Sequence, residues 1–155
     1  MVRPLALAAL MAVISLPLAV QAMAQEQRNL SAEEANRKLV VQFYDQFFNK
    51  HDVAHAAEVI SEDYIQHNPD VPDGKKPFVD YFTKFFKGTP QSKARIVRTA
   101  TSGDLVWLHV HSTNTATDRG QAVLDIFRVK DGKIVEHWDV IQDVLEQSAN
   151  GNSMF

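Results

Sequence analysis

Asp125 is the residue of this chain whose surroundings point most directly to acid–base chemistry. It lies in residues 123–140, where two β-forming runs flank Asp131-Gly132, a dipeptide typical of a two-residue hairpin turn. Alternation of side chains along the strands places Asp125 in a row of apolar and aromatic residues: Val123, Phe127, Val129, Ile134 and Trp138. A carboxyl group in such a row costs free energy unless it is hydrogen-bonded, protonated or used. We therefore predict that Asp125 is a candidate general acid or base.

An uninterrupted hairpin register pairs Asp125 with Trp138. In this register Phe127 and Trp138 form apolar walls beside the carboxyl group and contact the substrate. His137 and Asp139 then lie on the opposite face of the sheet, where we expect surface or interface groups.

Two histidines on the preceding predicted strand are further candidates for catalysis. His109 and His111 are two positions apart and therefore share one face of that strand. Both faces of the strand are apolar, so either one could line a pocket. On the pocket side, His111 and His109 would lie next to the strand that carries Asp125, where an imidazole can take part in acid–base chemistry. Together with His67 these residues could also bind Zn or Fe, but nothing in their spacing requires it, and we predict neither a metal nor another cofactor.

A loop with two prolines and a glycine, residues 64–74, is expected at the mouth of the pocket. Gln66, His67 and Asn68 precede Pro69, which favours an extended backbone in the residue before it. An extended loop can direct these three side chains towards a substrate, and ordinary turn chemistry explains the same residues about as well.

The order of the predicted elements indicates an α+β fold. Ser31 and Glu34 fit a capping box, and apolar residues at helical spacing continue from there to Phe48. A short second helix begins at Asp52, and a third covers residues 75–87. Strands follow in the second half of the chain, at residues 93–101, 104–113, 123–130 and 133–140. We predict three N-terminal helices packed on a curved antiparallel sheet of four strands, with room for one more short edge strand.

The first 24 residues have the features of a cleaved secretory signal peptide: Arg3, an apolar run, and small residues before Gln25. Residues 25–146 would then form a single domain and residues 147–155 a flexible tail. This predicts a periplasmic or secreted protein with no membrane attachment after cleavage. The chain has no cysteine, so it forms no disulfide, and its 16 basic and 19 acidic residues form no basic patch that would favour nucleic acid as a partner.

Three segments, residues 64–69, 125–128 and 131–139, resemble the SnoaL-like polyketide cyclase family of the nuclear transport factor 2-like superfamily, the predicted SnoaL-like aldol condensation-catalysing enzymes. The resemblance implies a curved sheet that wraps around helices and forms a conical pocket. In the cyclases, an aspartate on a central strand is the acid–base of an aldol ring closure. A histidine assists it, together with a polar residue two positions earlier on the preceding strand.

Asp125 matches that aspartate, His111 the histidine, and His109 the polar neighbour, where the family usually has an amide. The resemblance implies no metal and no organic cofactor. In the family, polar side chains at the mouth of the pocket contribute to the site, and the resemblance implies that Gln66, His67 and Asn68 do so here.

We therefore predict an exported enzyme that performs aldol-type condensation or isomerisation on a small, apolar, carbonyl-containing molecule. One alternative is a pocket of the same fold that binds such a molecule without catalysis. Another is an interaction domain that forms a homodimer through the outer sheet face, where His137, Asp139 and Ile141 are expected. Fold alone does not decide among these functions.

Overall fold

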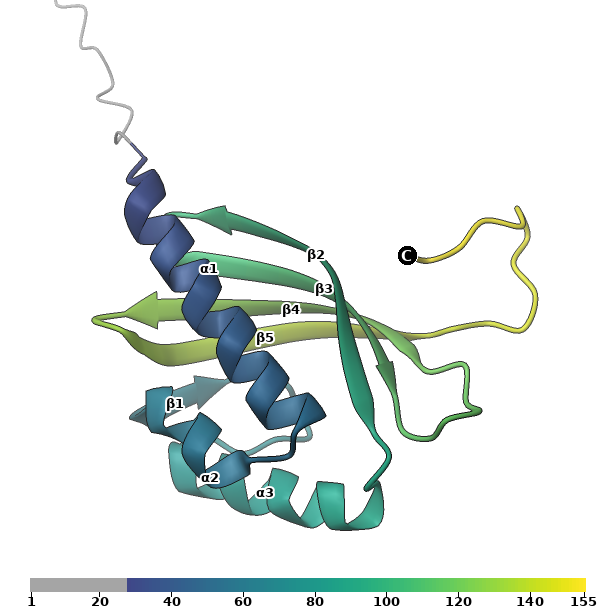
Figure 1. The fold of residues 1–155 in the computed structure, drawn as a ribbon, viewed down its shortest axis with the longest axis horizontal. Coiled ribbons are helices and arrows are strands. Elements are labelled where there is room, and N and C mark those ends of the chain that lie inside the picture. The colour runs from purple at the N-terminus through teal and green to yellow at the C-terminus, as the bar shows by residue number, and fades with distance from the viewer. Residues whose placement is uncertain (1–27) are drawn as a thin grey trace, which may run out of the picture.

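The computed structural model describes residues 28–155, and the predicted signal peptide lies outside this range. One layer of helices covers one face of a five-stranded sheet (Figure 1). The helices are α1 (Leu30–Tyr44), its π-helical continuation η1 (Asp45–Asn49), α2 (Val53–Ala56), the 3-10 turn η2 (Ala57–Val59) and α3 (Lys75–Gly88). The strands are β1 (Ile60–Gln66), β2 (Lys93–Ser102), β3 (Leu105–Thr113), β4 (Gln121–Lys130) and β5 (Lys133–Asp143). Within the described range, no helix combines the length and the apolar character needed to span a membrane.

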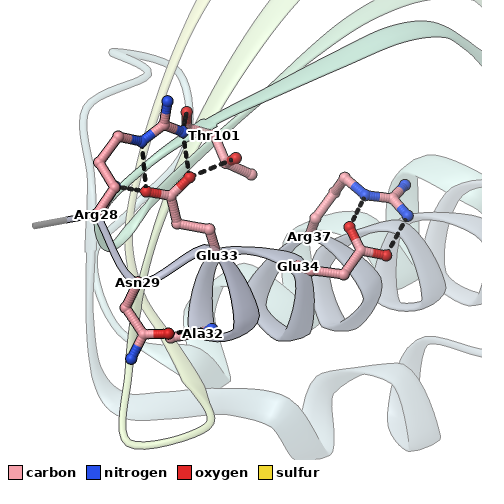
Figure 2. Close-up of polar contacts among 8 residues, drawn as sticks. Arg28, Asn29, Ala32, Glu33, Glu34, Arg37 and Thr101 are labelled. Carbon is pink, nitrogen blue, oxygen red and sulfur yellow. Dashed lines mark hydrogen bonds and ion pairs between the residues drawn. The ribbon is translucent and has the colours of Figure 1, made fainter.

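The start of α1 is set by Asn29. Its Oδ1 accepts a hydrogen bond from the backbone N–H of Ala32 at 3.0 Å (Figure 2). The predicted capping box of Ser31 and Glu34 is therefore wrong. Glu34 instead forms an ion pair with Arg37, one turn further along the helix.

Glu33 fastens the start of α1 to the turn between β2 and β3 (Figure 2). Its carboxylate forms an ion pair with Arg28 and accepts hydrogen bonds from Thr101 Oγ1 at 3.0 Å and from the Gly103 N–H at 3.1 Å. The hydrogen bond from Arg28, helped by the two other donors, lowers the pKa of Glu33 to about 2. These contacts of Glu33 attach the start of α1 to the end of β2 and the turn that follows it.

The hydrophobic core lies between α1, η1 and α3 on one side and the concave sheet face on the other. The helices contribute aromatic rings that contact one another, and Phe43 meets Phe127 of β4 edge to face at 5.9 Å. The sheet contributes side chains at every second position of β3 and β4: Val106, Leu108, Val110, Val123, Phe127 and Val129. Because the buried positions of β3 are all even-numbered, its odd-numbered residues face outwards.

The fifth strand, β1, corrects two details of the predicted fold. The sequence analysis assigned a loop from Tyr64 onwards, but the strand continues to Gln66, where it pairs with His137. β1 runs parallel to β5, so the sheet is mixed and not purely antiparallel. The loop that was predicted from its prolines and glycine therefore begins three residues later, after Gln66.

A β-bulge overturns the predicted register of the hairpin. The turn is where the sequence places it, and Lys130 pairs with Lys133. The register then shifts between Arg128 and Val129, so Asp125 pairs with Asp139 and not with Trp138. An extra residue in one strand exchanges the faces of every side chain beyond it. The bulge therefore turns His137 and Asp139 inwards and Trp138 outwards, which is the reverse of the prediction.

Candidate active site

A cavity of about 320 Å³ lies between the helices and the concave face of the sheet. Helix α3 and the π turn η1 supply an aromatic wall: Phe48, Phe78, Tyr81, Phe82 and Phe85. The opposite wall and the rim are polar, with Tyr44, Tyr64, Gln66, Asn68, Asp70, Ser112, Asn114, Gln121, Asp125, His137 and Asp139. An apolar pocket with a few convergent polar groups is the usual form of a small-molecule site.

Asp125 lines this cavity and is only 5% exposed. Both of its oxygens have a partner. Oδ2 accepts a hydrogen bond from the Tyr44 hydroxyl at 2.8 Å, and Oδ1 lies 2.9 Å from Nε2 of His137. The carboxyl group is thus buried and fully hydrogen-bonded, which accounts for its place in an apolar row.

The geometry fixes the protonation of the far side of the His137 ring. Gln66 Oε1 accepts a hydrogen bond from the backbone N–H of Asn68 at 3.0 Å, so this atom is the amide oxygen. The same oxygen lies 2.8 Å from His137 Nδ1. Because an oxygen of an amide can only accept, Nδ1 carries a proton.

One further proton belongs to the contact between His137 and Asp125. Nε2 and Oδ1 are 2.9 Å apart, a distance at which two lone pairs would repel. A proton therefore lies between them, either on the carboxyl group beside a neutral imidazole or on an imidazolium beside a carboxylate. The pair can hand this proton to, or take it from, a molecule in the cavity.

A second carboxylate, that of Asp139, stands beside the pair on the neighbouring strand. Its Oδ2 accepts a hydrogen bond from Asn68 Nδ2 at 2.7 Å. One ligand-type atom from each of Asp125, His137 and Asp139 lies within 4.8 Å of the other two. No lysine or arginine is among the described residues that line the cavity, so its ionisable side chains other than the tyrosines are the carboxyl groups of Asp70, Asp125 and Asp139 and the imidazole of His137.

Two buried tyrosines complete the polar wall. Burial, reinforced by the negative charge of Asp125, raises the pKa of Tyr44 well above its usual value. Burial raises the pKa of Tyr64 in the same way. Both hydroxyl groups therefore remain protonated and act as hydrogen-bond donors.

The structure brings together only some of the predicted site residues. Asp125, Phe127, Gln66 and Asn68 all line the cavity, as expected. Trp138 does not, because the bulge turns it to the outer face. There, the His67 ring stacks on it at 4.6 Å.

The two candidate histidines of β3 are likewise on the outer face. His109 Nδ1 contacts Arg98, and His111 Nε2 donates to the backbone oxygen of Arg119 at 2.8 Å. The Phe155 ring of the C-terminal tail stacks over His111 at 4.3 Å. The placement of His109 and His111 beside Asp125 was therefore wrong, because Val110 and not its histidine neighbours points to the core.

The sequence analysis missed four residues of the polar wall. Tyr44 lies among the apolar positions of the first predicted helix, and Tyr64 was assigned to the predicted loop; both are buried and line the cavity. His137 and Asp139 were assigned to the wrong face. A signal was present, because the uninterrupted register would have faced Glu136 towards Phe127, a costly place for a carboxylate.

Comparison with known proteins identifies the family of this arrangement. Residues 40–137 match the SnoaL-like domain, and this range is more than half of the chain. The chain belongs to the SnoaL-like domain family. The matched range of the SnoaL-like domain contains Tyr44, Gln66, Asp125 and His137, while Asp139 lies just beyond its end. A comparison with curated protein sequences gave no match.

Solved structures share the nuclear transport factor 2-like fold of this SnoaL-like domain. A candidate ketosteroid isomerase from Kribbella flavida is 15% identical, with a TM-score of 0.64 over 79% of this chain and 91% of its own. A candidate polyketide cyclase from Bacillus cereus is 23% identical, with a TM-score of 0.58 over 69% of this chain and 74% of its own. A SnoaL-like protein of unknown function from Burkholderia thailandensis is 15% identical, with a TM-score of 0.62 over 71% of this chain and 96% of its own. At these identities the likeness establishes the fold alone.

Proposed function

We propose that this SnoaL-like protein is an enzyme that moves a proton to and from the carbon beside a carbonyl group, in an aldol-type condensation or an isomerisation. The observation that carries the proposal is the buried chain Gln66–His137–Asp125, which holds one transferable proton at the end of an apolar cavity. A positioned acid–base of this kind contributes about 10²- to 10⁴-fold to a rate.

In the proposed reaction, Asp125 takes the proton from the carbon atom. Its carboxylate is steadied by the Tyr44 hydroxyl on one oxygen and by the His137 imidazolium on the other. His137 cannot rotate away because Gln66 holds its Nδ1–H. The same pair returns the proton at the end of the reaction, so the enzyme is regenerated.

Tyr64 is the group we propose for the substrate oxygen. Its hydroxyl oxygen accepts a hydrogen bond from Gln66 Nε2 at 3.4 Å, which leaves its own hydrogen to point into the cavity. A fixed donor at the carbonyl oxygen stabilises the enolate that forms when the neighbouring carbon loses its proton. The raised pKa of Tyr64 keeps this hydrogen in place.

The aromatic wall favours a small, largely apolar substrate. Rings from α3 and η1 cover the side of the cavity opposite Asp125, and the polar residues of the rim can bind a second polar group of the same molecule. We also propose that residues 1–24 direct export to the periplasm or the medium. Sequencing of the N-terminus of the protein recovered from the periplasm would give Gln25 as the first residue if this is correct.

Exchange of carbon-bound hydrogen for deuterium tests the proposed chemistry without knowledge of the natural substrate. We would incubate the protein in D₂O with a panel of enolisable cyclic and aromatic ketones and follow the loss of the α-proton signal by NMR. We expect catalysed exchange for at least one compound, and a fall of about 10²-fold or more in Asp125→Asn and in His137→Gln. His55→Gln, an exposed histidine on α2, is the matched control and should not change the rate.

Two results would contradict the proposal. Exchange that persists unchanged in Asp125→Asn would remove Asp125 from the chemistry. Saturable binding of the panel compounds with no exchange would make the cavity a ligand-binding site without catalysis.

A further inference from the structure

We propose that Asp125, His137 and Asp139 form a site for one divalent first-row transition-metal ion. In this state the ion takes the place of the proton shared by His137 and Asp125. The inference goes beyond the proposed acid–base function, because the ion and the transferable proton compete for the same two atoms.

The spacing of the three side chains suits a metal ion. Imidazole nitrogens and carboxylate oxygens bind such ions at about 2.0–2.2 Å, so two ligands at right angles lie about 3.0 Å apart. His137 Nε2 and Asp125 Oδ1 are 2.9 Å apart, and one ligand atom from each of Asp125, His137 and Asp139 lies within 4.8 Å of the other two. A side-chain rotation of Asp139 completes three neighbouring positions of a coordination sphere, and the remaining positions face the cavity.

Each of the three ligands is held from behind by a neutral side chain. Gln66 accepts from His137 Nδ1, Asn68 donates to Asp139 Oδ2, and Tyr44 donates to Asp125 Oδ2. These bonds engage Nδ1 of His137 and Oδ2 of each carboxylate, so Nε2 and the two Oδ1 atoms are left to bind an ion. Outer hydrogen bonds of this type orient metal ligands in proteins.

The charge of the cavity also favours a cation. Asp70, Asp125 and Asp139 line it, and no lysine or arginine does so among the described residues. One imidazole with two carboxylates is a donor set for Zn²⁺, Co²⁺, Mn²⁺ or Fe²⁺, whereas Mg²⁺ and Ca²⁺ prefer sites built of oxygen alone. Selection of a transition-metal ion is therefore attributed to His137.

Calorimetry of the chelator-treated mature protein with Zn²⁺ tests the site. We expect saturable binding of one ion per chain, and release of about one proton, measured by repeating the titration in buffers of different ionisation enthalpy. Co²⁺ should bind with visible absorption bands typical of nitrogen and oxygen ligands, and Mg²⁺ should bind at least tenfold more weakly than Zn²⁺. Binding of Zn²⁺ should be lost in His137→Gln and weakened about 10- to 100-fold in Asn68→Ala, which removes only an outer hydrogen bond.

Variants on the outer face separate this site from adventitious binding. His109 and His111 lie two positions apart on β3 and can bind Zn²⁺ by themselves, so His111→Gln is tested in parallel. Loss of Zn²⁺ affinity in His111→Gln, with affinity kept in His137→Gln, would overturn the proposal. The absence of saturable Zn²⁺ binding up to about 1 mM, a concentration on the order of the weakest specific dissociation constants, would also overturn it. Circular dichroism of each variant confirms folding, and Asp139→Asn, at a half-buried position, repeats the test without disturbing the core.

Discussion

The hydrogen bond between Tyr44 and Asp125 gives a quantitative test of the polar wall. Tyr44→Phe removes only the hydroxyl group, and the ring keeps its place against Phe48 and Phe127. The change leaves Asp125 Oδ2 without the donor that now lies 2.8 Å away. Because Tyr44 is 3% exposed and Asp125 is 5% exposed, solvent cannot fully replace this donor.

The expected cost follows from the burial and the charge of the acceptor. A buried group that loses its hydrogen-bond partner destabilises a fold by about 1–3 kcal/mol, and a bond to a charged group contributes about 1.5–3 kcal/mol. We therefore expect Tyr44→Phe to lower the free energy of unfolding by about 2 kcal/mol. In a double-mutant cycle with Asp125→Asn, the coupling energy should be about 1–2 kcal/mol.

Urea unfolding, followed by circular dichroism, measures all four proteins of the cycle. Tyr81→Phe is the matched control, because Tyr81 also lines the cavity but is 38% exposed, and its loss of a hydroxyl should cost less than about 0.5 kcal/mol. A coupling energy below about 0.5 kcal/mol between Tyr44 and Asp125 would refute the reasoning, since additive effects indicate sites that do not interact.

Three further predictions concern the framework of the site. The ionised form of Glu33 stabilises the fold above the ordinary pKa of 4.5, and this stabilisation is lost as the pH falls towards about 2. The temperature of thermal unfolding, measured from pH 6 to pH 2, should therefore fall less steeply in Glu33→Gln than in the wild type. Parallel curves for the two proteins would contradict this prediction. Leu108→Ala, at a fully buried position, should cost about 2–5 kcal/mol in urea unfolding, and a cost below 1 kcal/mol would mean that Leu108 is not in the core. Gly120→Ala should lower the free energy of unfolding by at least about 2 kcal/mol, because Gly120 has a φ of 71° and its added Cβ would lie 2.0 Å from the Ser112 backbone oxygen. Wild-type stability of this variant would contradict the conformation of the β3–β4 loop.

The architecture was largely accessible from the sequence because its signals are local. Helical spacing predicted α1 and α3, and the Asp131-Gly132 turn lies where it was expected. Turn chemistry and periodicity depend on neighbours in the chain, so a single sequence carries them. The parallel pairing of β1 with β5 was not predicted, because it joins segments that are far apart in the sequence.

The site was predicted only in part, and one residue of register explains most of the difference. Asp125 was found because a carboxyl group among apolar residues is a visible anomaly. Its partner His137 was missed because a bulge is a response of the strand to its surroundings. The only mark of it in the sequence is the cost of placing Glu136 opposite Phe127 in the uninterrupted register. The alternation argument then exchanged the roles of His137 and Trp138.

The histidines of β3 illustrate a different limit. Both faces of that strand are apolar, and the packing of α1 on Val106, Leu108 and Val110 decides which face is inside. This choice depends on tertiary contacts. Residue type alone therefore favoured His109 and His111, whereas the fold places His137 beside Asp125.

The most direct test of the account is the protonation of the His137 ring, observed by nitrogen-15 NMR of the protein with His137→Gln for assignment. We predict that Nδ1 carries a proton, because Gln66 accepts it, and that a second, slowly exchanging proton lies between Nε2 and Asp125. This second signal should disappear in Asp125→Asn. A ring with its proton on Nε2 and a bare Nδ1, or a ring that exchanges as fast as an exposed histidine, would contradict the proposed acid–base pair.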